Sequence, residues 1–262
     1  MNGKFSGIKA ALFDLDGTVY IGGKLIPGAK EAINALRRGG IKIVYLTNNS
    51  SADAEEYACK LTRLGVLDAA DEVCSSLTVG AKYLKEHNCG RVYAVASERV
   101  KSYLEKQGIA LAEDGGGADT VFLTYDKELN YDKLVTANRL LYAGAKYVAT
   151  HADKVCPAEG APLPDAGSFI ALFKESSGRL PDVIIGKPYP YMAEYLSEKL
   201  NLALSEMLMV GDRLYTDIAF GVNSGLKTAL VLSGETTDKM YSLSDIKADI
   251  VINSIADLPE YF

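Results

Sequence analysis

The sequence is poor in cysteine and histidine, has no excess of basic residues and contains no long apolar run. Its 262 residues include 4 cysteines and 2 histidines, and no C-x-x-C spacing, which argues against a zinc site or a disulfide framework. No apolar run approaches the roughly 20 residues of a membrane span. The net charge of -6 and the pI near 5.1 argue against a nucleic-acid-binding surface. We expect reduced core thiols at every cysteine: Cys59, Cys74, Cys89 and Cys156.

Length and composition are those of a soluble globular protein. Hydrophobic residues make up 48% of the chain and charged residues 24%, which is typical of that class. The length allows a sizeable core and favours two domains. Residues 1–7 lead directly into an apolar segment without room for a signal region, so we expect a cytoplasmic protein.

Short β-branched runs alternate along the chain with helical patterns that open at Pro, Ser or Asp and stop at Gly. This alternation predicts βαβ units, a parallel sheet and an α/β fold. The predicted strands lie near residues 8–14, 41–47, 91–97, 119–125, 146–151, 182–186, 207–211, 227–232 and 249–252. The predicted helices cover residues 28–38, 52–64, 77–87, 98–107, 131–143, 167–177, 189–200, 216–223 and 254–260.

The motif Asp14-Leu15-Asp16-Gly17-Thr18 places two carboxylates where the first apolar strand stops. Side chains alternate along a strand, so Asp14 and Asp16 point the same way and can reach one substrate atom. Gly17 and Thr18 then break the strand, which puts the pair at a carboxyl edge, where open α/β sheets bind their ligands. Alone, the motif is also compatible with an ordinary polar strand end followed by a turn.

Later motifs strengthen the prediction of a site, because each follows its own apolar run in the same way. They are Leu46-Thr47-Asn48-Asn49, Ile185-Gly186-Lys187-Pro188 and Gly211-Asp212-Arg213-Leu214-Tyr215-Thr216-Asp217. A shared position at four strand ends is hard to obtain by accident, and motifs gain meaning from such context.

The spacing of these motifs predicts the domain organisation. The interval from Thr18 to Thr47 is long enough for one loop, one helix and one strand, whereas the interval from Asn49 to Lys187 spans several βα units. We therefore expect a core domain made of residues 1–77 and 180–262, with a second α/β domain inserted over residues 78–179.

These residues resemble the haloacid dehalogenase superfamily, and specifically its phosphatases similar to NagD and the p-nitrophenylphosphatases. The resemblance covers nearly the whole chain. It implies a Rossmann-like parallel-sheet core with helices on both faces, and a large C2-type cap inserted between the second and third motifs. The segments that carry it are Asp14–Tyr20, Ile26–Ala29, Leu46–Ser50, Ile185–Pro188 and Gly211–Ile218.

Phosphoester hydrolysis needs positive charge, because a nucleophile approaches a phosphorus atom shielded by negative oxygens. Mg²⁺ fits this need, since it prefers oxygen ligands and bridges carboxylates to phosphate. Asp14 and Asp212 can supply its carboxylates, and Lys187 adds a permanent cation. The resemblance implies that Asp14 is the nucleophile, forming an aspartyl-phosphate, and that Asp14, the backbone carbonyl of Asp16 and Asp212 hold the metal.

Further roles are expected around this centre. Asp16 protonates the leaving oxygen and then takes a proton from the attacking water. Thr47, with the backbone N–H groups of Asn48 and Asn49, grips the phosphoryl oxygens at a helix N-terminus. Asp217 orients the metal's waters or Lys187, and it is equally compatible with capping the helix predicted over 216–223. Lys187 is also compatible with a solvated lysine at a strand end.

The inserted domain offers candidates for substrate selection, which resemble segments that face the active site in this subfamily: Tyr125, Asp126, His151, Asp153 and Asp165. The pair Thr150-His151 stands where the subfamily leads us to expect Thr-Asn, and Asp165 where we expect Gly. Either departure can redirect substrate choice. His151 is equally compatible with a strand-end histidine that makes a local hydrogen bond. The other histidine, His87, is expected on the solvated surface.

We therefore expect a Mg²⁺-dependent phosphomonoesterase acting on a small phosphorylated metabolite, such as a sugar phosphate, glycerol phosphate or nucleotide. No nucleic acid or membrane partner is expected, and the oligomeric state stays open. A phosphomutase is an alternative, disfavoured because related mutases usually carry their cap between the first two motifs. A non-catalytic protein that binds phosphometabolites is another. Dehalogenase and P-type ATPase activities are disfavoured because neither needs an acid or base at Asp16.

Overall fold

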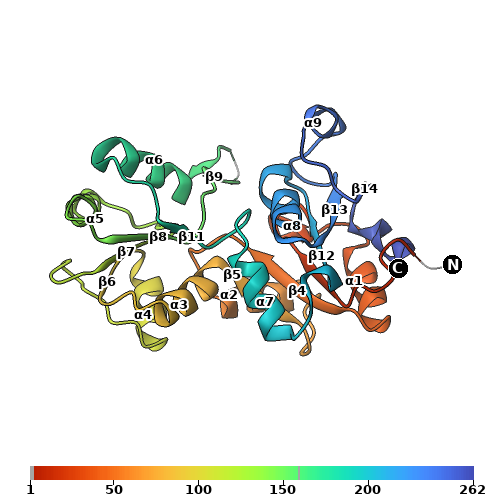
Figure 1. Ribbon diagram of the computed structural model, residues 1–262. Helices are drawn as coiled ribbons and strands as arrows, with labels where there is room; N and C mark the ends of the chain where they lie inside the picture. Colours follow the sequence, from red (N-terminus) through yellow and green to blue (C-terminus); the bar gives the residue numbers. More distant parts are fainter. Residues whose placement is uncertain (1–2, 159) are drawn as a thin grey trace. The chain divides into compact units, whose positions relative to one another are not determined.

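The computed structural model of the chain describes residues 3–158 and 160–262 and shows an α/β protein (Figure 1). The chain divides into two compact units. The first comprises Met1–Thr47, Glu55–Cys74 and Lys187–Phe262, and the second comprises Asn48–Ala54 and Ser75–Gly186. The insertion predicted over 78–179 falls inside the second unit. No helix in either described stretch is both long enough and apolar enough to span a membrane.

The first unit is built on a sheet with the strand order β14-β13-β12-β1-β4-β5. The pairs from β14 to β4 are parallel. All residues of β1 and β12 are buried, as expected for central strands covered by helices on both faces. The strands are β1 (Ala10–Phe13), β4 (Lys42–Thr47), β5 (Glu72–Ser75), β12 (Met207–Gly211), β13 (Lys227–Val231) and β14 (Ile250–Ile252).

Helices and short turns complete this unit. The helix α1 begins after Gly28, whose φ of 78° lies in the left-handed region that favours glycine. The helix buries Ala29, Ile33 and Leu36 against the core. The α-helices are α1 (Ala29–Arg38), α2 (Ala54–Arg63), α7 (Tyr191–Leu200), α8 (Ala219–Ser224) and α9 (Asp238–Leu243). The other elements are the hairpin β2 (Tyr20–Ile21) and β3 (Lys24–Leu25), the 3-10 helices η1 (Leu204–Glu206) and η3 (Ile255–Tyr261), and the π-helical turn η2 (Leu214–Ile218).

The sheet topology brings the ends of three strands together. β1 lies between β12 and β4 and runs parallel to both. Asp14 follows the end of β1, Thr47 closes β4, and Asp212 follows β12. From β1 the chain adds β4 and β5 on one side of the sheet and later β12, β13 and β14 on the other side. Open α/β sheets bind their ligands at such a switch point.

The second unit has its own parallel sheet, in the order β11-β8-β7-β6. Tyr147 and Phe173 meet edge to face in its core, with ring centroids 6.1 Å apart. An antiparallel ribbon of β9 (Val155–Cys156) and β10 (Leu163–Pro164) lies outside this sheet. The remaining elements are β6 (Val92–Val95), β7 (Thr120–Leu123), β8 (Lys146–Ala149), β11 (Val183–Ile184), α3 (Ser76–Glu86), α4 (Glu98–Lys106), α5 (Tyr131–Tyr142) and α6 (Ala166–Ser177).

The structure corrects several predicted elements. The helix predicted over 216–223 begins as the π-helical turn η2 and continues as α8, while the segment 254–260 forms the 3-10 helix η3 with Pro259 inside it. Strand β5, helix α9 and the ribbons of two-residue strands were not predicted. These elements are too short to show a hydrophobic period, and β5 carries polar residues at both ends.

The prediction of core thiols is wrong for two cysteines. None of the four forms a disulfide, but Cys59 is exposed and Cys156 is only partly buried. Cys74 and Cys89 are buried as predicted, and burial raises the pKa of Cys74 to about 12. Cys59 lies on α2, which buries only Leu61 completely.

Candidate active site

Three carboxylates and one lysine meet at the carboxyl edge of the first unit's sheet. One carboxylate oxygen each from Asp14, Asp212 and Asp217 lies within 4.8 Å of the other two. Lys187 Nζ donates to Asp14 Oδ1 at 2.6 Å and to Asp217 Oδ1 at 2.7 Å. The Lys187 side chain is 2% exposed, so it is a buried counter-ion and not the solvated lysine of the alternative interpretation.

The Asp212 side chain occupies space that is open only because two neighbouring residues are glycines without a Cβ atom. A Cβ atom on Gly17 would lie 2.5 Å from Asp212 Oδ2, and one on Gly234 would lie 2.0 Å from the same atom. Gly17 also has a φ of +91°, which a residue with a side chain rarely adopts. The Glu235 N–H donates to Asp212 Oδ2 at 2.7 Å. The backbone thus fixes one oxygen of this carboxylate.

Asp217 is held from both sides within η2. Its Oδ1 accepts from Lys187, and its Oδ2 accepts from the Arg213 N–H at 3.0 Å. The residue before α8 is Ile218, with no side-chain cap, so the suggested cap of that helix by Asp217 is wrong. A Cβ on Gly211 would lie 2.3 Å from Asp217 Cβ, so the glycine that ends β12 lets η2 pack closely.

The charge balance of this cluster is incomplete. Burial raises the pKa of Asp14, with Asp217 and Asp212 adding to the effect and Lys187 opposing it. Burial and Asp217 together raise the pKa of Asp212 to about 7. Asp212 Oδ1 is buried and has no hydrogen-bond partner among the described residues. Carboxylates so arranged need further positive charge to remain ionised.

A divalent cation fits this donor set. Hard cations bind carboxylate oxygens, and the oxygens of Asp14, Asp212 and Asp217 converge on one region, where Asp212 Oδ1 lacks a protein donor among the described residues. The sequence pointed to Asp14 and Asp212 as carboxylate ligands. For Asp217 it predicted only a supporting role, because nothing in the sequence spacing shows how closely η2 folds back on β12.

Asp16 stands apart from this cluster, and its side chain is exposed. Neighbouring protein atoms nevertheless desolvate its carboxyl group and raise its pKa, while Lys60, Arg213 and the Tyr20 hydroxyl act in the opposite direction. Lys60 Nζ lies 3.6 Å from the centroid of the Tyr20 ring. Sequence reasoning missed Lys60 and Arg213, although Arg213 directly follows Asp212 in the fourth motif.

The predicted phosphate-binding residues are divided between the units. Thr47 is buried at the end of β4 in the first unit, whereas Asn48 and Asn49 belong to the second. Asn48 Nδ2 donates to both carboxylate oxygens of Asp153, at 3.1 and 3.2 Å. Asn49 Oδ1 accepts from the Ser51 N–H at 3.0 Å. Both amide side chains are therefore engaged within their own unit.

Three candidate selection residues form a cluster in the second unit. His151 is fully buried, with Nδ1 3.7 Å from Asp153 Oδ2 and Nε2 3.5 Å from Asp165 Oδ1. Neither ring nitrogen has a hydrogen-bond partner among residues 3–158 and 160–262, so the suggested local hydrogen bond of His151 is not formed. Burial raises the pKa of Asp165, and His151 opposes this effect.

The two other candidates lie in different surroundings. Asp126 accepts from Lys133 Nζ at 2.7 Å and from the Glu128 N–H at 2.8 Å, which ties it to helix α5. Tyr125 is buried, and burial raises the pKa of its phenol, with Cys156 adding to the effect. The histidine outside this group, His87, is exposed as predicted and stacks on Tyr83.

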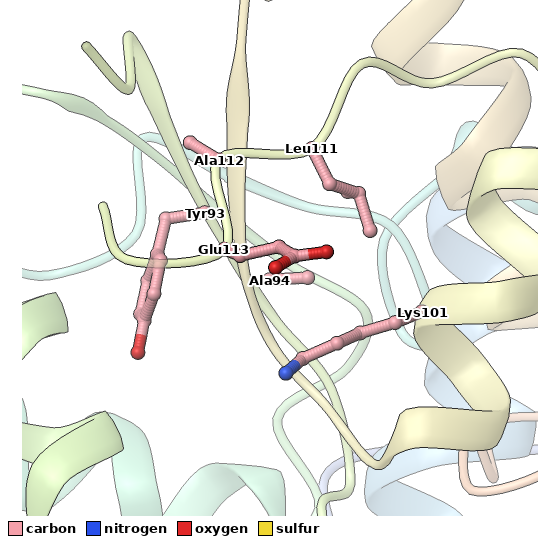
Figure 2. Close-up of a pocket in the computed structure, with 6 residues that line it drawn as sticks. All are labelled: Tyr93, Ala94, Lys101, Leu111, Ala112 and Glu113. Atoms are coloured by element: carbon pink, nitrogen blue, oxygen red, sulfur yellow. The ribbon is translucent and has the colours of Figure 1, made fainter. Parts of the chain in front are cut away.

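Figure 2 shows a pocket elsewhere in the second unit. None of the candidate residues lines this pocket. Lys101, which borders it, pairs with Glu98 at 2.6 Å. The lining lacks a cluster of carboxylates, so we do not assign the active site there. The lining residues are Tyr93, Ala94, Lys101, Leu111, Ala112 and Glu113.

Comparisons with known proteins identify the family of the chain. A family model for haloacid dehalogenase-like hydrolases matches residues 11–110, and a second HAD-hydrolase-like model matches residues 184–258. An acid sugar phosphatase of Staphylococcus saprophyticus is 38% identical over 230 residues, which cover 87% of this chain and 88% of the relative. The chain therefore belongs to the haloacid dehalogenase-like hydrolases.

Solved structures extend the likeness to the whole fold. A 4-nitrophenylphosphatase from Thermotoga maritima superposes with a TM-score of 0.93 and 38% identity, covering 98% of each chain. A glycerol phosphate phosphatase from Mycobacterium tuberculosis, crystallised in complex with magnesium, gives a TM-score of 0.90 at 26% identity, covering 100% of this chain and 78% of that one. The predicted fold class and the resemblance to NagD-like phosphatases are confirmed.

Proposed function

We propose that this chain is a Mg²⁺-dependent phosphomonoesterase that hydrolyses a small phosphorylated metabolite through an aspartyl-phosphate. The observation that carries the proposal is the cluster of Asp14, Asp212 and Asp217 around the buried Lys187. The names of the relatives support the reaction class, since they include a sugar phosphatase, a nitrophenylphosphatase and a glycerol phosphate phosphatase.

Asp14, Asp212 and the backbone carbonyl of Asp16 are our proposed metal ligands, and Asp217 would orient the metal's waters or bind the metal directly. A bound divalent cation would offset the negative charge of the phosphoryl oxygens. Lys187 contributes to the same balance, because its ammonium group contacts Asp14 Oδ1 at 2.6 Å. This contact holds the Asp14 carboxylate in one orientation and favours its ionised form.

Asp14 attacks phosphorus with a carboxylate oxygen, the bond to the leaving oxygen breaks, and an acyl phosphate forms on Asp14. Asp16 gives its proton to the leaving oxygen, then accepts a proton from the water that hydrolyses the acyl phosphate. The raised pKa of Asp16 favours the proton donor form in the first step. Thr47 and the backbone N–H groups of Asn48 and Asn49 are the proposed ligands of the phosphoryl oxygens.

We further propose that the second unit acts as the cap and selects the leaving group. The cluster of the buried His151 and Asp165 with the partly buried Asp153 supports this role, because the imidazole and the carboxylates approach one another without forming hydrogen bonds. Polar groups that are not satisfied by the protein are available to a ligand. Tyr125 and Asp126 are weaker candidates, since Asp126 is already paired with Lys133. We propose the cytoplasm as the compartment, in keeping with four cysteines that form no disulfide.

Hydrolysis of p-nitrophenyl phosphate by the purified full chain tests the reaction class. We expect phosphate release with Mg²⁺, loss of activity after chelation and recovery when Mg²⁺ is restored. Release of phosphate to water distinguishes a phosphatase from a phosphomutase, which returns the phosphoryl group to an alcohol. Binding of phosphorylated metabolites without turnover of any of them would instead indicate a non-catalytic binding protein.

A further inference from the structure

Lys60 is held next to the turn that carries the proposed proton donor. Its Nζ lies 3.6 Å from the centroid of the Tyr20 ring, and Tyr20 is fully buried. The Gly17 N–H donates to the Tyr20 carbonyl at 2.8 Å, and Asp16 pairs with Tyr20 as an isolated bridge. A cation over an aromatic face is held by the negative potential of the ring. The ammonium group is thus held over the Tyr20 ring, close enough to Asp16 for its charge to lower the pKa of that carboxyl group.

Lys60 differs from the other cations around the site because it has no carboxylate at ion-pair distance among the described residues. Lys187 contacts two carboxylates of the cluster. Arg213, the other cation near Asp16, pairs with Glu235 at 2.9 Å. Burial lowers the pKa of Lys60, Asp16 opposes that effect, and Arg63 adds to it. The charge of Lys60 is therefore only partly balanced by the protein.

The position of Asp16 determines what a charge at Lys60 can contact. A proton donor must reach the leaving oxygen, so atoms attached to that oxygen lie close to Asp16 and within reach of the Lys60 ammonium group. We propose that Lys60 is a specificity-determining residue, which selects phosphomonoesters whose leaving alcohol carries a second anionic group, either a carboxylate or another phosphate. This inference rests on the proposed function, because it assumes that Asp16 faces the leaving group.

A panel of substrate pairs that are matched in structure and differ by one anionic group tests the inference. The carboxylate arm compares 2-phosphoglycolate with 2-hydroxyethyl phosphate and 3-phosphoglycerate with glycerol 3-phosphate. The phosphate arm compares fructose 1,6-bisphosphate with fructose 1-phosphate, scoring release of the 1-phosphate in both. We expect the full chain with Mg²⁺ to favour the more anionic member of at least one arm by about tenfold or more in kcat/KM. The arm that shows the preference identifies the anion.

Variants then assign the preference to the side chain. Lys60→Met should reduce kcat/KM for the preferred anionic substrates by about tenfold and leave their neutral partners and p-nitrophenyl phosphate within about twofold. Lys60→Arg, which keeps the charge, should retain most of the preference. Lys42→Met, an exposed lysine at the start of β4, controls for loss of a positive charge elsewhere in the first unit.

Two results would overturn the inference. Equal losses on anionic, neutral and aryl phosphates in Lys60→Met would assign Lys60 a structural role in holding Tyr20. A wild-type profile without preference in either arm would also exclude the proposed selection for a second anionic group. In both cases turnover of p-nitrophenyl phosphate by the wild type would leave the proposed function standing. Absence of that turnover in metal-replete protein would contradict the proposed function itself.

Discussion

Both units bury a cluster of ionisable side chains, but they balance its charge differently. In the first unit Lys187 contacts Asp14 and Asp217 at 2.6 and 2.7 Å. In the second, the ring nitrogens of His151 lie 3.7 and 3.5 Å from the carboxylates of Asp153 and Asp165 and make no hydrogen bond among the described residues. These short contacts fix Asp14 and Asp217 in place, as catalysis of one reaction requires, although Asp212 Oδ1 has no hydrogen-bond partner among the described residues. The second cluster leaves polar atoms available, as selection among ligands requires.

Removal of the nucleophile should have the largest effect. Asp14→Asn keeps the side-chain volume and removes the attacking carboxylate, so we expect kcat to fall by at least about 10⁴-fold while the fold is retained. The measurement is hydrolysis of p-nitrophenyl phosphate with saturating Mg²⁺, with circular dichroism as the check on folding. Asp132→Asn, on the exposed start of α5, serves as the matched control. Turnover near that of the wild type would refute Asp14 as the nucleophile.

Removal of the buried cation should destabilise the first unit. Lys187→Met leaves the carboxylates of Asp14 and Asp217 without their partner, and breaking a buried ion pair in this way costs about 3–5 kcal/mol. We expect a decrease of that size in the free energy of unfolding, measured by urea denaturation without divalent metal. Phosphatase activity should be lost as well. A variant as stable as the wild type would show that the Lys187 contacts do not balance this cluster.

Binding of a divalent cation should stabilise the wild type by less than the loss of Lys187 destabilises it. A ligand that binds only the folded state adds about 2.7 kcal/mol at 100 times its dissociation constant, so Mg²⁺ should raise the midpoint of thermal unfolding. Asp212→Ala removes a proposed ligand and should abolish this shift at the same Mg²⁺ concentration. KCl at matched ionic strength controls for screening. An equal shift in wild type and variant would place the stabilising cation elsewhere.

The second cluster should affect substrate choice more than the reaction. His151→Asn should change the relative kcat/KM among phosphorylated metabolites by more than about tenfold, or about 1.4 kcal/mol, and leave small aryl phosphates nearly unaffected. His87→Asn, at an exposed position stacked on Tyr83, is the control. An unchanged substrate ranking would assign His151 a structural role, and Tyr125 and Asp165 would be the next residues to change.

The sequence predicted the first cluster far better than the second, for a physical reason. Asp14, Lys187 and Asp212 each follow an apolar run, and parallel strands bring such ends to one edge of a sheet. The close approach of Asp217 depends on the π-helical turn η2 and on the space left by Gly211, and neither leaves a periodic signal in the sequence. Lys60 lies on a helix with a single fully buried residue, so nothing in its sequence pattern distinguished it from a surface lysine.

In the second unit, the sequence could name His151 and Asp165 only as departures from the pattern of a resembling subfamily. Their proximity depends on how the segment after β8 packs against the start of α6, where the Asp165 side chain accepts from the Ala166 N–H. Contacts between loops carry no hydrophobic period, so such a cluster emerges only from the folded structure.

Trapping of the covalent intermediate tests the central claim most directly. The full chain is mixed with p-nitrophenyl phosphate and Mg²⁺, quenched in acid during turnover and reduced with borohydride, which converts an acyl phosphate of aspartate into homoserine. Peptide mass spectrometry then locates the modified residue. The account predicts homoserine at position 14 in the wild type and none at that position in Asp14→Asn. Reduction at another residue, or turnover without any reducible intermediate, would contradict the role proposed for Asp14.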